Sequence, residues 1–150
     1  MGNRAVIAFK TTELASIPED YRPCIYLHEH GSRDSVEAFL QTAKDSDIRP
    51  GEYGIARLTQ LIANYIGGTL SIGITCYCLA DRDNWDNGVY WVDDNFNIVG
   101  REYQQGPDIN EQDVDQLVAK VKEANLYSKL NCHARSIRLN TANQIRDAAL

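Results

Sequence analysis

The chain has 150 residues, of which 43% are hydrophobic and 24% charged, a composition typical of one globular domain and unlike a disordered or low-complexity chain. Lys and Arg total 15 against 21 Asp and Glu, and the formal net charge of −6 argues against DNA or RNA as partners, because nucleic-acid binding depends on a cationic surface. No apolar run is long enough to span a bilayer and no signal-peptide pattern is visible, so we expect a cytoplasmic protein that does not bind membranes.

Two periodicities divide the chain into elements. Short runs rich in β-branched and aromatic residues predict strands, and apolar residues spaced three and four apart predict amphipathic helices. In chain order the predicted elements are strands at 5–9 and 24–28, helices at 35–44 and 55–65, strands at 69–79, 89–92 and 98–103, and a helix at 111–127. This order predicts one α+β domain over residues 1–127, with a mostly antiparallel sheet of about five strands packed with two to three helices.

Turn and capping signals set the boundaries of these elements. Asp34, followed by Glu37 three residues later, has the spacing of a capping box and predicts that the first helix starts directly after Asp34. Gly67 ends the second helix. The apolar density of residues 69–79 predicts a central strand, and the turn at residues 93–95 predicts a hairpin between the last two strands.

The segment 128–150 has too few apolar residues to form a core of its own. Ile137, Leu139, Ile145 and Leu150 nevertheless need apolar surface to cover them. We therefore expect a polar C-terminal extension that takes part in oligomer contacts, and a homo-oligomer in which the ligand binds where two subunits meet.

Two places in the sequence suggest metal binding without meeting its requirements. His28 and His30, two apart on a predicted strand, would face the same way, but a third ligand would have to come from outside the pair, such as His133 or Asp34. The loop 81–88 is rich in Asp but lacks the glycine and glutamate positions of an EF-hand. We interpret the histidines as hydrogen-bonded structural residues and the loop as a polar lip, and we expect no metal or other cofactor.

The four cysteines match neither a zinc nor a disulfide pattern. They are Cys24, Cys76, Cys78 and Cys132. We interpret them as small buried hydrophobic residues in a reducing compartment.

Arginines at three positions are placed where an anion can reach them. Arg33 precedes a predicted helix N-terminus, Arg57 follows a glycine-containing segment, and Arg101 follows Gly100. Guanidinium groups bind phosphate through two parallel hydrogen bonds, and aromatic rings stack on bases. The candidate aromatic residues are Tyr53, Trp85 and Tyr90. These residues, with the Asn-rich loop that contains Asn87, indicate a pocket for a phosphate-bearing ligand.

Catalytic motifs are absent from the sequence. It contains no Gly-x-Ser-x-Gly nucleophile elbow, no phosphate-binding Walker loop and no Gly-x-Gly-x-x-Gly fingerprint. We therefore predict no catalytic residues and expect a binding protein rather than an enzyme.

Three stretches of the sequence form a recognisable pattern together. They are Ile25–Leu40, which contains Gly31-Ser32-Arg33-Asp34-Ser35; Ala56–Asn64, which contains Ala56-Arg57-Leu58; and Asp86-Asn87-Gly88 with Ile98-Val99-Gly100-Arg101-Glu102. This pattern resembles the first type of bacteriophage Thoeris anti-defence proteins. The resemblance covers roughly residues 4–103. It implies a sponge that binds cyclic ADP-ribose isomers, and cyclic trinucleotides at separate sites, without cleaving them, and that assembles into dimers and hexamers.

The resemblance also implies ligand-contacting residues. The family uses arginines, an asparagine and an aromatic residue, which Arg57, Arg101 and Asn87 match here, with Trp85 or Tyr90 as the aromatic residue. Two other functions stay open at this point. One is a small metal-dependent phosphodiesterase that acts on a cyclic nucleotide, and the other is an acidic interaction protein that binds a host factor.

Overall fold

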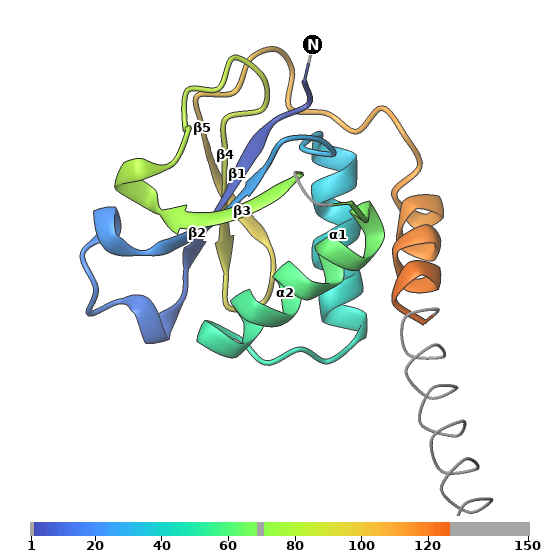
Figure 1. Cartoon of the computed structure of the whole chain (residues 1–150), viewed down its shortest axis with the longest axis horizontal. Helices are drawn as coiled ribbons and strands as arrows, with labels where there is room; N and C mark the ends of the chain where they lie inside the picture. Colours follow the sequence, from blue (N-terminus) through green and yellow to red (C-terminus); the bar gives the residue numbers. More distant parts are fainter. Residues whose placement is uncertain (1, 69–70, 127–150) are drawn as a thin grey trace, which may run out of the picture.

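A five-stranded mixed sheet with helices on one face forms the fold of the computed structural model, which describes residues 2–68 and 71–126 (Figure 1). The strands are β1 (Ala5–Lys10), β2 (Pro23–Leu27), β3 (Ile72–Cys76), β4 (Val89–Asp93) and β5 (Ile98–Glu102). The helices are α1 (Arg33–Asp45), α2 (Gly51–Ile66) and a third over 114–126, and the 3-10 turns are η1 (Thr12–Leu14), η2 (Glu19–Tyr21) and η3 (Tyr77–Leu79). The predicted α+β class is confirmed.

The most apolar run of the sequence forms the centre of the sheet. The strand order is β3-β2-β1-β4-β5, in which β1 pairs antiparallel with β2 and parallel with β4. The first five residues of β1, Ala5 to Phe9, are at most 1% exposed. Both faces of a central strand are buried, so its sequence is a continuous apolar run rather than an alternating one.

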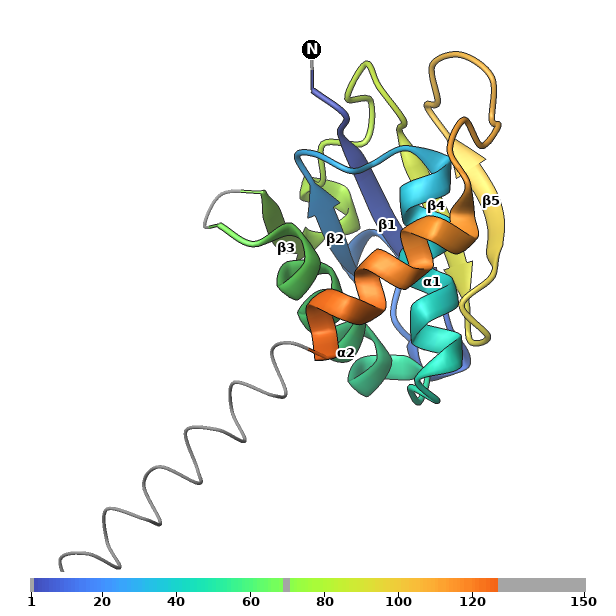
Figure 2. The same ribbon diagram turned by 90° about the vertical axis from the view of Figure 1, so that its right-hand side faces the viewer.

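The helices form two layers on one face of the sheet. Figures 1 and 2 show α1 and α2 against the strands and the helix over 114–126 outside them. Leu117, Val118 and Val121 of this outer helix join the same buried apolar cluster as α1, α2 and the sheet. The amphipathic patterns of three segments therefore converge on one core.

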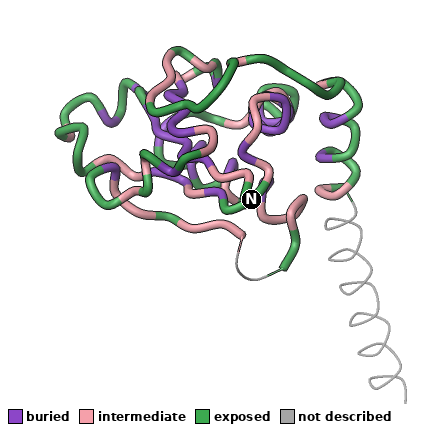
Figure 3. Tube along the Cα trace, turned by 90° about the horizontal axis from the view of Figure 1, so that it is seen from above, coloured by how far each residue is buried: buried purple, intermediate pink, exposed green. Residues whose placement is uncertain are grey.

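The opposite face of the sheet carries a smaller core. Its buried members come from the alternate positions of β1, β2 and β4, and Tyr77 of η3 packs across them; they are Val6, Ala8, Cys24, Tyr77, Val89 and Trp91. The rings of Tyr77 and Trp91 have centroids 4.9 Å apart. Figure 3 shows the buried residues concentrated in the strands and on the sheet-facing side of the helices.

Three boundary predictions are wrong. The segment predicted as a central strand forms the edge strand β3, whose Ile74 is 57% exposed, and the chain turns into η3 after Cys76. Strand β2 ends at Leu27, so His28 and His30 lie beyond it. Helix α1 begins at Arg33 with Ser32 as its N-cap residue, so Asp34 lies inside the first turn and does not cap the helix.

The interpretation of the cysteines as buried residues holds only in part. Cys24 is buried, and burial raises the pKa of its thiol to about 12. Cys76, at the end of the edge strand β3, is half-buried, and Cys78, in the turn η3, is exposed. Cys132 lies outside the described residues.

The predicted extension over residues 128–150 also lies outside the described residues, so its contribution to oligomer contacts stays a prediction. Within the part of the chain that the structure describes, no helix has the length and apolarity needed to cross a membrane.

Candidate functional site

A cavity of about 260 Å³ lies where the first turn of α1, the start of β4, the end of β5 and the following loop meet. Polar and charged side chains dominate its walls. The lining residues are Asn3, Ser32, Arg33, Asp34, Asn87, Tyr90, Arg101, Gln104, Gln105, Pro107, Asp108, Ile109 and Glu111.

The register of β4 and β5 produces the central pair of the cavity. Tyr90 lies directly opposite Arg101, so the two side chains share a face of the sheet. The guanidinium carbon of Arg101 lies 3.6 Å from the centroid of the Tyr90 ring, within cation–π distance. The Tyr90 hydroxyl donates to the Gly31 carbonyl at 2.8 Å, and burial raises the pKa of this phenol. Tyr90 therefore supports Arg101, and the guanidinium group of Arg101 covers one face of the Tyr90 ring.

Backbone carbonyls fix the orientation of the Arg101 guanidinium. Its Nε donates to the Val89 carbonyl at 3.1 Å, and Nη2 donates to the Asn87 carbonyl at 2.6 Å. The side chain is 11% exposed. Burial lowers the pKa of this guanidinium, and the neighbouring Tyr90 and Asp108 oppose that shift. Arg101 is held rigidly, with Nη1 directed at Asp108.

Two arginines from different elements converge on one carboxylate. Arg33, in the first turn of α1, places Nη1 2.7 Å from one Asp108 oxygen, and Arg101 Nη1 contacts the other oxygen. Arg33 also pairs with Glu37 one turn later, with Nη2 2.8 Å from Oε1. The two guanidinium groups therefore hold one anionic group between them, the carboxylate of Asp108.

Asp34 forms the floor of the cavity and ties it to the loop after β5. This residue is 2% exposed, and its carboxylate accepts hydrogen bonds from the Ser32 hydroxyl and from the backbone N–H groups of Ser35, Glu111 and Gln112. Burial raises the pKa of the Asp34 carboxyl, but the four hydrogen bonds outweigh it and leave the pKa below its usual value. Asp34 is thus a structural anion.

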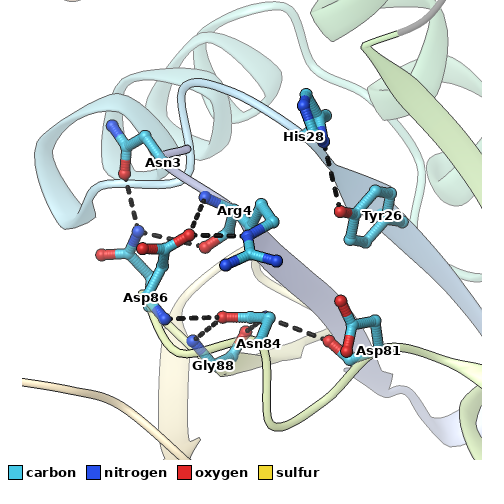
Figure 4. A network of polar contacts seen from close by, with 9 residues as sticks. Asn3, Arg4, Tyr26, His28, Asp81, Asn84, Asp86 and Gly88 are labelled. Atoms are coloured by element: carbon cyan, nitrogen blue, oxygen red, sulfur yellow. Dashed lines mark hydrogen bonds and ion pairs between the residues drawn. The ribbon is translucent and has the colours of Figure 1, made fainter. Parts of the chain in front are cut away.

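Figure 4 shows how the Asn-Gly turn before β4 is held. The buried Asn84 side chain accepts hydrogen bonds from the backbone N–H groups of Asp86 and Gly88 and donates to the carbonyls of Asp81 and Gly88. Gly88 has φ +64°, and a Cβ at this position would lie 2.1 Å from the Glu102 carbonyl oxygen. This packing fixes the Asn87 carbonyl that Arg101 contacts.

The N-terminal residues close the same side of the cavity. Asn87 Nδ2 donates to Asn3 Oδ1 at 2.6 Å and to the Arg4 carbonyl at 3.1 Å. Asp86 accepts from Arg4 Nε at 2.8 Å. Burial raises the pKa of the Asp86 carboxyl, but the hydrogen bonds and charge of Arg4 outweigh it and lower the pKa overall.

Four of the seven predicted ligand-binding residues lie in the wall of the cavity, and three lie elsewhere. Arg33, Asn87, Tyr90 and Arg101 line the one cavity.

The other three lie outside its walls. Tyr53 and Arg57 are four residues apart on α2, both exposed; Arg49 stacks on Tyr53 at 4.7 Å, and Arg57 donates to Gln60 at 3.0 Å. Trp85 lies in the loop before β4, with φ +61° and 77% of its surface exposed.

The histidines do not converge. His28 Nδ1 lies 3.4 Å from the Tyr26 hydroxyl (Figure 4), and the His30 ring packs edge-on against Tyr65 with centroids 5.4 Å apart. Among residues 2–68 and 71–126, no three His, Cys, Asp or Glu side chains are grouped closely enough to hold a metal ion.

Sequence reasoning missed the acidic half of the site. Asp108 lies in an irregular polar segment after β5, in which no periodicity or motif distinguishes one carboxylate from another. The pairing of Asp34 with Glu111 and Gln112 joins positions 77 and 78 residues apart. No local signal in the sequence points to such contacts.

Comparison of the chain with protein-family models, with curated proteins and with solved structures finds no match.

Proposed function

We propose that this protein binds and sequesters a phosphate-bearing nucleotide signal and does not cleave it, in the manner of a bacteriophage Thoeris anti-defence sponge in the cytoplasm of an infected bacterium. The convergence of Arg33 and Arg101 on one anion position supports this proposal most directly. Two guanidinium groups that meet from separate elements match the charge and the oxygen geometry of a phosphate group.

The rigidity of the cavity supports binding. Arg101 is fixed by two carbonyls and an aromatic ring, and the first turn of α1 places Arg33 at a helix N-terminus, where anions are favoured. A sponge needs affinity and slow dissociation, and groups that are already oriented lose little conformational entropy when the ligand binds.

The size of the cavity limits what one chain can enclose. A volume of about 260 Å³ is below the roughly 300–1,000 Å³ of pockets that enclose a whole small-molecule ligand. The cavity therefore takes the phosphate part of a cyclic ADP-ribose isomer or a cyclic trinucleotide, and the base extends beyond it. Because the Tyr90 ring supports Arg101, the exposed ring of Trp85 is the better candidate for stacking on a base.

Binding of a nucleotide panel with recovery of the ligand tests this function. Purified protein is incubated with cyclic ADP-ribose isomers, cyclic trinucleotides and ADP-ribose, analysed by native mass spectrometry, and then heat-denatured to release the ligand. We expect one nucleotide to bind and to be recovered intact. Recovery of a cleaved product would instead indicate a phosphodiesterase, and binding of no nucleotide would favour an interaction protein.

Substitution of Arg101 assigns the binding to this cavity. The Arg101→Lys variant keeps the positive charge but loses the planar fork and the stacking on Tyr90, so we expect about 10-fold to 100-fold weaker binding by calorimetry. The control variant Lys10→Met, on β1 with its amine 5.0 Å from the Trp91 ring, changes a cation outside the cavity and should bind like wild type. Equal binding by Arg101→Lys and wild type would place the ligand elsewhere.

A further inference from the structure

We propose that Asp108 is a built-in competitor of the ligand, and that this competition selects for a diphosphate group. This inference rests on the proposed function of the cavity. In the ligand-free protein the Asp108 carboxylate neutralises Arg33 and Arg101, and it leaves them when a diphosphate enters.

The contacts of Asp108 are those that a phosphate group would make. One of its oxygens lies 2.7 Å from Arg33 Nη1, and the other is bonded to Arg101 Nη1. The bridging position between the two guanidinium groups is taken by this carboxylate, so an anion that binds there has to displace it. Binding of phosphate at this point therefore requires exchange of one anion for another.

The segment that carries Asp108 is anchored firmly at its two ends. At one end the Gln105 N–H donates to the Asp86 carbonyl at 2.9 Å. At the other end the N–H groups of Glu111 and Gln112 donate to the buried Asp34 carboxylate. Both anchors are independent of Asp108, so its departure leaves the cavity wall in place.

Between these anchors, three polar contacts tie the segment 106–110 to the rest of the described chain. They are the two ion pairs of Asp108 and a 2.8 Å hydrogen bond from Asn110 to Glu37. Ile109 is 58% exposed, and Gly106 has φ +80° with open space where a Cβ would lie. No residue of this segment belongs to either buried apolar cluster, so an outward movement costs little packing energy.

The competition also defines the class of ligand. A phosphodiester carries one negative charge, as does the carboxylate it would replace, whereas a diphosphate carries two or more and can contact each arginine with a separate phosphoryl group. A resident carboxylate therefore disfavours singly charged anions. The cavity is matched to a diphosphate-containing nucleotide rather than to a nucleotide linked by phosphodiesters alone.

Calorimetry with inorganic pyrophosphate tests this inference. The Asp108→Asn variant removes the carboxylate that bridges the two guanidinium groups and leaves the pairing of Arg33 with Glu37 in place, so we expect its affinity for pyrophosphate to rise at least about 10-fold over wild type. The matched control Asp45→Asn removes an exposed carboxylate that pairs with Lys122 outside the cavity, and its affinity should be unchanged. Acetate, a single carboxylate, should not displace pyrophosphate from wild type.

Hydrogen exchange of the wild-type protein provides a second measurement that does not depend on a variant. We expect the amides of Gly106 and of residues 108–110 to exchange faster when pyrophosphate binds, because the segment leaves Arg33 and Arg101. Two results would contradict the role of Asp108 as a competitor without contradicting the anion site itself. One is equal or weaker pyrophosphate binding by Asp108→Asn than by wild type, and the other is slower exchange of these amides in a wild-type protein that binds pyrophosphate. Failure of both proteins to bind pyrophosphate or any nucleotide would overturn the proposed function itself.

Discussion

The guanidinium group of Arg101 shows how one side chain connects the core to the candidate site. It stacks on Tyr90, donates to two carbonyls and pairs with Asp108, and these partners lie in β4, in the turn before it and in the loop after β5. Replacement of such a residue removes structural contacts as well as binding contacts. Binding measurements on Arg101 variants therefore need a parallel measurement of stability.

At the same scale, Asp34 is a buried residue whose ionised carboxylate stabilises the folded state. Its folded-state pKa is below the ordinary value of about 3.9 for Asp, because its hydrogen bonds outweigh its burial. A lowered folded pKa means that this contribution to stability is fully present above the unfolded pKa and is lost as pH falls through the folded pKa.

We predict that Asp34→Asn lowers the free energy of unfolding by about 1–3 kcal/mol at pH 7, because the amide nitrogen cannot accept from Glu111 and Gln112. The difference from wild type should shrink as pH falls below about 4, where the carboxyl of the unfolded chain becomes protonated, and should be lost as pH falls through the lower folded-state pKa. Urea unfolding from pH 7 to pH 2.5 measures both effects. The exposed Asp83→Asn variant is the control, and a difference from wild type that stays constant with pH would contradict the role of the charge.

At the scale of elements, the hydrophobic periodicity of the sequence predicted which segments form helices and strands, but it could not predict which strands lie side by side in the sheet. The apolar run of β1 and the turn between β4 and β5 are local signals, and the strands appear where they were expected. The same apolar density in residues 69–79 suggested a central strand, yet β3 lies at the edge, because strand order is set by packing rather than by local sequence.

The sequence predicted the arginines of the candidate site but not their carboxylate partner. Arginines beside glycines and helix starts are conspicuous, and Arg33 and Arg101 do meet in one cavity. Their carboxylate partner is one of 21 acidic residues and has no distinguishing context. The Asp34–Glu37 spacing pointed to a cap, but Glu37 instead pairs with Arg33 and Asn110.

The outer helix over 114–126 yields a prediction at this scale. Leu117 is 7% exposed and belongs to the core shared by α1, α2 and the sheet. We predict that Leu117→Ala lowers the free energy of unfolding by about 2–4 kcal/mol, through lost burial and the cavity left behind. Urea denaturation measures this, with the exposed Glu123→Ala as the control. An unchanged midpoint for Leu117→Ala would show that the helix does not stabilise the core.

At the scale of the whole molecule, the predicted binding residues fall into separate groups. Arg33, Asn87, Tyr90 and Arg101 share the cavity, whereas Tyr53 and Arg57 lie on an exposed face of α2. In Figure 1, α2 starts near the lower edge of the view and the loops around the cavity lie at the top. If one small ligand contacts both groups, a second copy of the chain would supply one of them; the homo-oligomer, either a dimer or a hexamer, stays a prediction.

Mixing of two inactive variants tests this arrangement. If Arg57 of one subunit and the cavity of another bind the same nucleotide, then Arg57→Ala and Arg101→Ala should each lose binding as homo-oligomers. In a randomly mixed dimer population, half of the dimers are mixed and one of the two sites in each is intact, so about a quarter of the wild-type sites should return. Native mass spectrometry of the mixture after dissociation and reassembly counts these sites.

A second mixture supplies the control. Arg33 and Arg101 belong to one cavity on one chain, so Arg33→Ala mixed with Arg101→Ala leaves a damaged cavity in every subunit and should restore nothing. Recovery in this mixture would mean that the cavity itself is built from two subunits. Wild-type affinity in Arg57→Ala would exclude Arg57 from the site, because a phosphate that loses a charge-assisted hydrogen bond binds roughly 10-fold more weakly or worse. The ligand would then be bound by each subunit separately, through the cavity beside Tyr90 alone.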